Sequence, residues 1–514
     1  MLSKVLSSSV IGVDAHKIDV EVDVSSGLPV FNIVGLPEAA VKESKERVRA
    51  AIKNSGYTFP MDRITVNLAP ASIKKEGTGF DLPIAIGVLA ASGAIPQDMF
   101  PTHLVLGELS LDGSVKSVRG SLPAALMSKN EALSGFVLPR DNGKEASVVQ
   151  DVRIFPASHL SDVVDFFRGF DAISPLPAHP LDIMESGASE DLVDFSEVVG
   201  QAHVKRALEI GAAGFHNVLM LGPPGSGKTM LARRLSTILP SMTLAESIDT
   251  TKIYSVSGKL DTDAALVTTR PFRSPHHTIS DAGLIGGGHI PKPGEISLAH
   301  NGVLFLDEFP EFRKNVLEAL RQPLEDHHVT LSRAASAITY PSSFMLIAAM
   351  NPCPCGYLTD QNRECTCSLT QIRKYRTRLS GPLLDRIDIH VEVPAVPYDR
   401  LVRDAREESS KMIRDRVVAA RNTQRSRFRR SRTTANARMT GRQINTYCRL
   451  DEDAGKMLLS AMERLGLSAR AYNRILKISR TIADLSGEKD IRSDHVLEAI
   501  QYRSLDRDGK TVNS

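Results

Sequence analysis

A glycine-rich segment that ends in a lysine and a threonine carries the clearest chemical signal in the sequence. The run Gly222-Pro-Pro-Gly-Ser-Gly-Lys-Thr229 fits the G-x4-G-K-[ST] pattern of a phosphate-binding loop. The apolar run Asn217–Leu221 precedes it and the amphipathic run Met230–Ile238 follows it. The loop would therefore join a buried strand to the N-terminus of a helix, where backbone N–H groups can surround phosphate oxygens. Lys228 would reach the β and γ phosphates of ATP, and the Thr229 hydroxyl would ligate Mg²⁺.

An apolar run that ends in two acids supplies the other half of such a site. In the segment Gly302–Glu308, Asp307 would hold Mg²⁺ and Glu308 would orient and deprotonate the attacking water. This pair predicts a hydrolase, and a strand with a solvated acidic end is the alternative interpretation. The residues predicted to bind the nucleotide are Gly222, Pro223, Pro224, Gly225, Ser226, Gly227, Lys228, Thr229 and Asp307, of which Thr229 and Asp307 also bind the metal ion.

A cluster of cysteines predicts a second metal site. Cys353, Cys355, Cys365 and Cys367 form two C-x-C pairs in one short stretch, and Cys448 stands apart. A disulfide framework would be spread over the chain, so clustered thiols favour a metal. Four thiolates can hold one tetrahedral Zn²⁺, which would be structural because no ligand position stays open. Free buried thiols are the alternative, because C-x-C is less typical of zinc sites than C-x2-C.

Two further segments resemble those of AAA+ ATPases. Asp194–Gln201 resembles the segment that precedes the AAA+ phosphate loop. Phe344–Asn351 resembles the third strand of that fold, which ends in the polar residue called sensor 1. The resemblance implies that Asn351 polarises the attacking water or binds the γ-phosphate, beside the catalytic Glu308.

Two arginines complete the resemblance. Ser380–Asp388 resembles the arginine-finger segment and points to Arg386, and Leu467–Asn473 resembles the sensor 2 motif of the helical lid and points to Arg470. An arginine supplied across a subunit interface can accelerate phosphoryl transfer by ~10³-fold or more. If Arg386 acts in this way the protein must form a ring, and the family implies a hexamer. For either arginine alone, a surface salt bridge is the more common interpretation.

Within AAA+ the chain resembles the magnesium-chelatase-like clade, and over its whole length the ComM/YifB subfamily. The shared features are a leading domain, the cysteine cluster just after Asn351 and chelatase-type C-terminal helices. The resemblance implies a DNA helicase that promotes branch migration of recombination intermediates in natural transformation. Its partners would be single-stranded or branched DNA and recombination proteins. A chelatase-type ATPase that remodels a protein partner is the alternative, and an ATP-dependent protease or adaptor is a third.

Two insertions could contact a substrate. Arg270–Ser297 resembles the helix 2 insert of chelatases and replicative helicases, and we assign no role to its pair His276 and His277. Val329–Tyr340 alternates like a hairpin and resembles the pre-sensor 1 hairpin, with Arg333 near its tip. A lone arginine there suits a phosphate contact, and a solvated loop is equally expected. The basic run at 421–432, which includes Arg425, Arg427, Arg429, Arg430 and Arg432, supports DNA binding only weakly, because charge runs are usually solvated helix faces.

The N-terminal third resembles the Lon protease domain over residues 69–140. A Lon-type enzyme needs a serine nucleophile activated by a lysine, and matching the segments puts Gly79 and Leu122 at these two places. Neither residue can do that chemistry. We therefore expect a fold like that of Lon and ribosomal protein S5 domain 2, without peptidase activity, and a role in ring assembly or substrate docking.

The composition of the chain and of its segments predicts the class of protein and the domains that position these motifs. The 514 residues are 42% hydrophobic and 24% charged, which excludes a disordered or fibrous chain, and a net charge of +3 predicts no partner. No apolar run reaches the ~18 residues of a membrane span, and the first residues lack the core of a signal peptide, so we expect a cytoplasmic protein. We predict a multidomain α/β protein with a Lon-like α+β domain at 1–170, a linker at 171–192, an AAA+ α/β core at 193–397 and a helical lid at 398–514.

Overall fold

The computed structural model describes residues 1–177, 193–261, 264–288, 291–333, 336–360, 363–396, 407–431 and 433–503. These residues form two compact units. Unit 1 takes the described residues of Met1–Ala188, Thr243–Thr269 and Ser332–Tyr340, and unit 2 takes those of Ser189–Met242, Arg270–Leu331 and Pro341–Ser514. The fold class predicted from the sequence is confirmed, because the chain is a mixed α/β protein with a parallel sheet and a helical C-terminal region.

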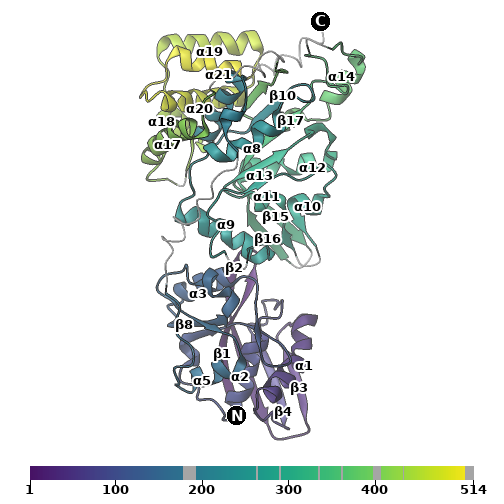
Figure 1. Ribbon diagram of the computed structural model, residues 1–514, viewed down its shortest axis with the longest axis vertical. Helices are drawn as coiled ribbons and strands as arrows, with labels where there is room; N and C mark the ends of the chain where they lie inside the picture. The colour runs from purple at the N-terminus through teal and green to yellow at the C-terminus, as the bar shows by residue number, and fades with distance from the viewer. Residues whose placement is uncertain are drawn as a thin grey trace. The chain divides into compact units, whose positions relative to one another are not determined.

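Unit 1 is built on a seven-stranded mixed sheet in the order β3-β4-β2-β1-β5-β8-β9, seen in the lower part of Figure 1. In β2, Ile18, Val20 and Val22 alternate with more exposed residues and are fully buried, as the period of a half-buried strand requires. β1 pairs antiparallel with β2, and β5, β8 and β9 continue the sheet in parallel. The strands are β1 (Leu2–Ile11), β2 (Asp14–Ser25), β3 (Val30–Val34), β4 (Arg63–Ala69), β5 (His103–Val105), β8 (Gly135–Pro139) and β9 (Arg153–Ala157), with β6 (Glu108–Leu109) and β7 (Val115–Lys116) as a separate ribbon.

Helices of unit 1 pack on this sheet. Every residue of α2 is buried, so the longest apolar run of the sequence is a core helix. Within the described residues, no helix is both long enough and apolar enough to span a bilayer. The helices are α1 (Ala39–Asn54), α2 (Asp81–Ala91), α3 (Ser121–Asn130), α4 (Gly143–Ala146), α5 (Leu160–Phe167) and α9 (Leu244–Ser257).

Helix α9 belongs to unit 1, although the sequence placed its residues inside the AAA+ core at 193–397. The Ser255 hydroxyl accepts a hydrogen bond from the backbone N–H of Gly120, at the start of α3, at 3.1 Å. Lys252 forms an ion pair with Asp14 of β2 at 2.8 Å, and Ile248 packs against the apolar cluster beneath α3. These contacts join α9 to unit 1, although its residues are far from the rest of unit 1 in the sequence. Compact unit 1 is thus discontinuous in sequence, whereas the predicted domains are continuous.

The expected linker at 171–192 also begins later in the structure. Ile173 is buried in the core of unit 1, and Leu176 forms a bridge with Ile154 of β9. The chain therefore stays on unit 1 through these residues, and the rest of the predicted linker, from residue 178, lies outside the described residues.

Unit 2 contains a five-stranded parallel sheet in the order β11-β14-β17-β10-β18. Strands β10, β14 and β17 are buried at every position, as strands covered on both faces should be. The strands are β10 (Val218–Leu221), β11 (Phe272–Arg273), β14 (Val303–Leu306), β17 (Met345–Met350) and β18 (Ile389–Glu392). A smaller pair in this unit is β12 (Gly286–Gly287) with β13 (Lys292–Pro293). The predicted hairpin is formed by β15 (His328–Arg333) and β16 (Ser336–Pro341), of which Ser332–Tyr340 is assigned to unit 1.

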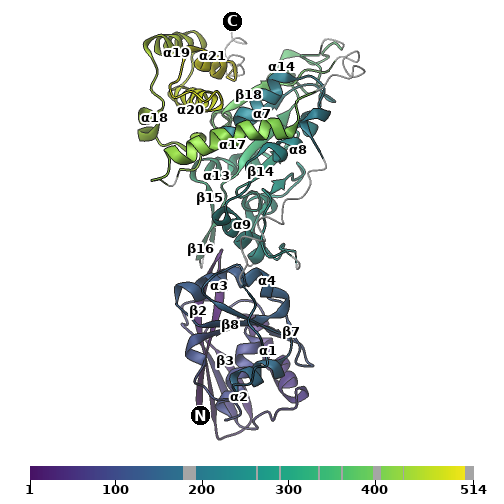
Figure 2. The same ribbon diagram turned by 60° about the vertical axis from the view of Figure 1, so that its left-hand side comes forward.

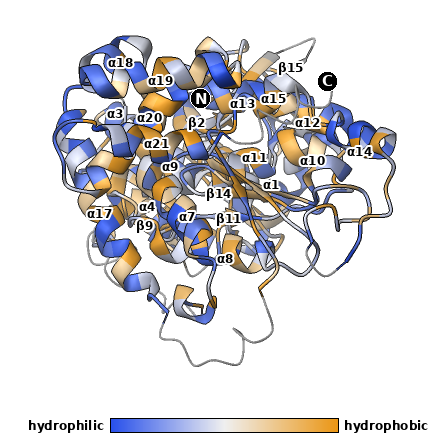
Figure 3. Cartoon of the chain, turned by 90° about the horizontal axis from the view of Figure 1, so that it is seen from above, coloured by the Kyte–Doolittle hydropathy of each residue, from blue (hydrophilic) through white to orange (hydrophobic). Residues whose placement is uncertain are grey.

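Helices flank the sheet of unit 2. The C-terminal helices form a group of their own, in which Figures 1 and 2 show α17, α20 and α21 close together. These helices carry both hydrophobic and hydrophilic residues (Figure 3), as helices with one buried face do. Those of the core are α7 (Ala202–Gly214), α8 (Lys228–Ile238), α10 (Asp281–Ile285), α11 (Glu295–Leu298), α12 (Lys314–Ala319), α13 (Arg321–Asp326), α14 (Leu369–Arg376) and α15 (Gly381–Leu384). The C-terminal ones are α17 (Ser410–Arg427), α18 (Gly441–Tyr447), α19 (Glu452–Leu465), α20 (Ala469–Leu485) and α21 (Ser493–Gln501).

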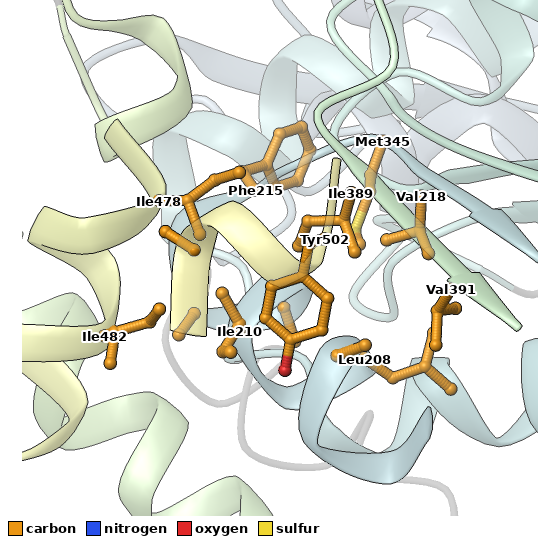
Figure 4. Close-up of a cluster of buried hydrophobic side chains, with 14 of the residues drawn as sticks. Leu208, Ile210, Phe215, Val218, Met345, Ile389, Val391, Ile478, Ile482 and Tyr502 are labelled. Atoms are coloured by element: carbon orange, nitrogen blue, oxygen red, sulfur yellow. The ribbon is translucent and has the colours of Figure 1, made fainter. Parts of the chain in front are cut away.

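One apolar cluster joins the C-terminal helices to the sheet. In Figure 4, Ile478 and Ile482 of α20 extend toward the residues of α7 and the sheet, among them Ile210 and Ile389. A polar link accompanies it, because the buried Asp388 carboxylate forms an ion pair with Arg474 of α20 and accepts a hydrogen bond from the Asn217 N–H at 3.1 Å. The lid helix and the strand before the phosphate loop are thus held by the same contacts.

Candidate active site

The phosphate loop lies at the carboxyl end of β10 and leads directly into α8. Gly225 and Gly227 have φ values of +76° and +88°, a region that glycine enters without strain, and this lets the chain curl before the helix. The buried Lys228 ammonium donates to the carbonyl oxygens of Gly222 and Pro223, both at 2.8 Å. Burial lowers the pKa of Lys228, and the charge of Asp307 opposes this shift.

Another side chain of the loop has an unused polar atom. The Ser226 hydroxyl is buried and makes no hydrogen bond within the described residues. The Ser226 carbonyl accepts a hydrogen bond from Gln201 Nε2 at 2.8 Å, so Gln201 holds this part of the loop from outside. An orphaned hydroxyl beside glycine N–H groups suits an incoming phosphate oxygen, and the loop therefore fits the nucleotide that its sequence predicts.

The two acids follow β14, which neighbours β17 in the sheet. The Thr229 hydroxyl donates to Asp307 Oδ2 at 2.6 Å, which brings together the hydroxyl and carboxylate oxygens predicted to bind Mg²⁺. Asp307 Oδ1 accepts from the Glu308 N–H at 2.9 Å. Glu308 has a φ of +51°, which is costly for a residue with a side chain and is concentrated at functional sites.

These elements enclose a cavity of about 650 Å³. Its walls are formed by the phosphate loop from Pro224 onward, by Asp307 and Glu308, and by Asn351, which follows β17. Gly222 and Pro223, which were also predicted to bind the nucleotide, are not among the residues that line it. Asn351 Oδ1 lies 3.4 Å from the Lys228 ammonium. Three parallel strands end at this edge of the sheet, so residues separated by more than a hundred positions meet there. The structure thus brings together the predicted phosphate loop, Asp307, Glu308 and Asn351.

The two predicted arginines lie away from this cavity in the same chain. Neither Arg386 nor Arg470 contributes to its lining. Arg386 is almost buried and forms an ion pair with Glu325 of α13. The pKa of Glu325 is lowered first by the hydrogen bond from Arg386 and also by the charges of Arg386 and Arg470. Arg386 is therefore paired with Glu325 in its own chain, and the structure brings neither arginine to the nucleotide cavity.

The four clustered cysteines lie together after Asn351. Their Sγ atoms all fall within 4.8 Å of one another. The Sγ atom of Cys353 is 3.3 Å from that of Cys355 and 3.6 Å from that of Cys365. Sulfurs around a tetrahedral zinc with Zn–S bonds of about 2.3 Å are about 3.8 Å apart. The spacing fits the predicted zinc ligands Cys353, Cys355, Cys365 and Cys367, whose identity as ligands stays a prediction.

The cysteine loop touches the phosphate loop. Gly356 follows Cys355 at a φ of +88°, and a β-carbon built on it would lie 2.6 Å from Cδ of Pro224. That distance is far below van der Waals contact, so only glycine lets the backbone at residue 356 lie so close to the Pro224 ring. A change in the conformation of the cysteine loop would therefore displace Pro224, which lines the nucleotide cavity.

The site includes residues to which the sequence analysis gave no role. The stretch Ser274–His277, directly after β11, forms a further wall of the cavity. His277 Nδ1 lies 3.0 Å from Glu308 Oε2. The signal that could have found it is positional, because β11 is parallel to β14 and both strands end at the catalytic edge. Residues just after that strand must lie beside Asp307 and Glu308.

The basic run of the lid divides between internal contacts and the surface. Arg427 donates to Asp484 and to Asn436, the latter at 3.0 Å, so its charge is used inside the lid. Arg425, Arg429 and Arg430 are exposed, and Arg432 lies outside the described residues. Arg333 ends β15, and nothing is described of its side chain. In unit 1, Gly79 precedes α2 and Leu122 is fully buried in α3.

Comparison with known proteins identifies the family to which the chain belongs. Residues 194–401 match the family described as magnesium chelatase, subunit ChlI; residues 20–142 match subunit ChlI of Mg-chelatase; and residues 407–503 match the ChlI C-terminal family. The YifB protein of Salmonella typhimurium is 45% identical over 510 residues, and competence protein ComM of Haemophilus influenzae is 45% identical over 511, with 98% of each chain covered in both cases. The chain belongs to the ComM/YifB family of magnesium-chelatase-like proteins. Lon protease 2 of Bacillus subtilis is 32% identical over 150 residues, 27% of this chain and 26% of its own.

Membership of the ComM/YifB family makes the chain an AAA+-type ATPase that uses ATP and Mg²⁺. Magnesium would supply a charge that holds and polarises the terminal phosphates when the nucleotide is bound. The residues that fit this ion are Thr229 and Asp307, which already share a hydrogen bond.

Proposed function

We propose that this ComM/YifB family chain is a ring-forming motor that acts on DNA, as a helicase that promotes branch migration of recombination intermediates. The observation that carries the DNA substrate is the similarity to a competence protein over 98% of both chains. The ATPase cavity supplies the energy source, with Lys228 on the phosphates and Glu308 as the base for the attacking water.

The ring rests on the positions of Arg386 and Arg470. Both lie outside the nucleotide cavity of their own chain, and Arg386 forms an ion pair with Glu325. In a hexamer they would approach the nucleotide of a neighbouring subunit, where an arginine stabilises charge on the transferring phosphoryl group. Hydrolysis then requires assembly, and each subunit reports its nucleotide state to the next.

The cysteine cluster completes the proposal as a structural zinc site. Four sulfurs at near-tetrahedral spacing bind zinc without leaving a position open for substrate. The site would fix the loop that follows Asn351, and through Gly356 it would support Pro224 of the phosphate loop.

The experiment that tests this function is ATP turnover by the full-length protein alone, with single-stranded DNA and with a four-way junction. Stimulation that is strongest with the junction, followed by ATP-dependent strand displacement, is the expected result. Glu308→Gln should bind ATP without turnover, and Lys228→Ala should lose binding. Turnover that no DNA changes would instead favour a chelatase-type ATPase that remodels a protein partner, the second candidate suggested by the ChlI family match.

A further inference from the structure

The clustered cysteines begin in a segment that contacts the phosphate loop on both sides of Cys353 and Cys355. Two positions before Cys353, Asn351 Oδ1 lies 3.4 Å from the ammonium of the phosphate-loop lysine. Directly after Cys355, the backbone of Gly356 lies against the Pro224 ring. The Gly356 N–H donates to the Cys353 carbonyl at 3.0 Å, which closes the turn that carries both cysteines. A change at these sulfurs therefore acts on a segment held between two contacts with the nucleotide cavity.

The sulfurs are close enough to react with one another and open enough to be reached from solvent. All four are free thiols. Cys353 is buried, whereas Cys355, Cys365 and Cys367 are half-buried. Cys355 Sγ lies 3.6 Å from Cys365 Sγ. A small oxidant can therefore reach one sulfur of this pair while the second sulfur, which would complete a disulfide, is already beside it.

Chain geometry favours Cys355 and Cys365 as the pair that joins. They are ten positions apart, so the chain between them can adjust to the specific geometry of a disulfide. The Sγ atoms of Cys353 and Cys355 are only 3.3 Å apart, but these residues are separated by Pro354 alone, whose ring restricts the backbone. A bond between Cys355 and Cys365 also ties the first C-x-C pair to the second.

We propose that Cys355 and Cys365 form an oxidation site, at which a hydroperoxide converts two thiols to a disulfide and thereby weakens ATP binding. One sulfur attacks a peroxide oxygen, the O–O bond breaks, and a sulfenic acid forms as the first water leaves. The second sulfur attacks the first, the S–S bond forms, and the second oxygen leaves as water. The two sulfurs lose two electrons, and hydrogen peroxide is reduced to two waters that take up the two thiol protons.

A metal ion in the cluster changes only the source of the protons. Sulfurs that bind zinc are thiolates, so solvent then supplies the two protons. The ion is released, because thiolates are the ligands and two of them have been consumed. With or without zinc, the new bond replaces the four-sulfur arrangement that fixes the turn before Gly356.

The consequence reaches the nucleotide through Pro224. Gly356 follows Cys355 directly, and Pro224 both touches Gly356 and lines the cavity. Movement of the turn therefore displaces the start of the phosphate loop, and the bound nucleotide loses contacts. The inference rests on the ATP site of the proposed function and is independent of DNA.

The test compares the reduced full-length protein with the same protein treated with hydrogen peroxide. The Kd for a fluorescent ATP analogue should rise about 10-fold, and a colorimetric chelator should detect about one released zinc per chain. Trypsin cleaves after Arg363, between the two cysteines, so mass spectrometry without reduction should find two peptides joined by the Cys355–Cys365 disulfide. Dithiothreitol with added zinc should restore the Kd. This recovery excludes oxidation of the cavity residue Met230, because dithiothreitol does not reduce a sulfoxide.

Cys448→Ala is the matched control, because Cys448 is buried in the lid core away from the cluster. It should respond to peroxide as the wild type does. A complete Cys355–Cys365 disulfide that leaves the Kd unchanged would overturn the inference. Loss of binding that occurs without the joined peptides, that dithiothreitol does not reverse, or that disappears in Cys448→Ala would overturn it too. Failure of the reduced protein to bind the ATP analogue would instead overturn the ATP site of the proposed function.

Discussion

The α-carbon of Gly356 lies so close to Pro224 that a single added methyl group would meet the proline ring at 2.6 Å. The backbone of the cysteine loop is thus in close contact with a proline ring of the phosphate loop. We expect Gly356→Ala to displace Pro224, because the left-handed backbone of Gly356 leaves the new side chain no other direction. The Kd for ATP should rise about 3- to 10-fold. Gly455→Ala, at a position with no atom within 4 Å of the new carbon, is the control and should bind ATP normally.

Loss of the zinc ion should disturb the cysteine loop more than the Gly356→Ala substitution does. Cys365→Ser removes one of four sulfurs, so zinc content should fall from about one per chain to a small fraction of that, and the thermal midpoint should fall with it. Elemental analysis and calorimetry measure the two quantities. Cys448→Ala is the matched control, because Cys448 lies in the lid core and should leave zinc content unchanged. Full zinc binding by Cys365→Ser would remove the case for this site.

The position of Arg386 outside the nucleotide cavity of its own chain predicts complementation between defective subunits. Arg386→Ala should lower kcat about 10³-fold, with ATP binding retained. Mixing it with Lys228→Ala subunits should recover activity, since intact loops then meet intact arginines at some interfaces. A mixture of Lys228→Ala with Glu308→Gln, which both damage the cavity, should stay inactive. Failure of the first mixture, in rings shown to be mixed, would contradict action across subunits.

The pairing of Asp388 with Arg474 predicts how stability depends on pH. Burial alone would raise the pKa of Asp388, but the charge of Arg474 and then the interaction with His216 hold it well below its ordinary value. The unfolded state, where the pKa is about 3.9, therefore binds more protons as the pH falls. The stabilisation is complete above about pH 5 and is lost as the pH falls through the lowered folded value.

Asp388→Asn tests this dependence by denaturation followed with circular dichroism. At neutral pH it should lower the free energy of unfolding by about 3–5 kcal/mol, because it leaves Arg474 without its charge partner. Below about pH 4 the wild type should lose stability more steeply than the variant. Parallel pH curves for the two proteins would mean that Asp388 is not the responsible group.

Local motifs allowed most of the catalytic edge to be predicted from the sequence. The phosphate loop, Asp307, Glu308 and Asn351 each follow an apolar run, and parallel strands bring such positions together whatever lies between them in the chain. His277 was missed because β11 consists of two residues, Phe272 and Arg273, too few to show a strand period. The contact of His277 with Glu308 arises only in the folded chain.

The arginines illustrate a different limit. Their motifs could be recognised, but Glu325, the acid that pairs with Arg386, belongs to a short helix with no distinguishing pattern. In the sequence, the arginines of the basic run at 421–432 cannot be told apart. In the structure, Arg427 turns inward because Asp484 lies opposite it on α20. A pairing between residues 57 positions apart depends on how two helices pack, which residue spacing does not report.

Because α9 and Ser332–Tyr340 belong to unit 1, the order in which the chain is synthesised matters. A ribosome that has passed the predicted linker has not yet made all of this unit. The α3 surface that receives Ser255, together with the apolar cluster that receives Ile248, has to wait for α9 while the phosphate loop is already being made. Unit 1 therefore cannot finish packing until segments made after the phosphate loop have joined it, and cutting the gene once at the linker would leave unit 1 incomplete.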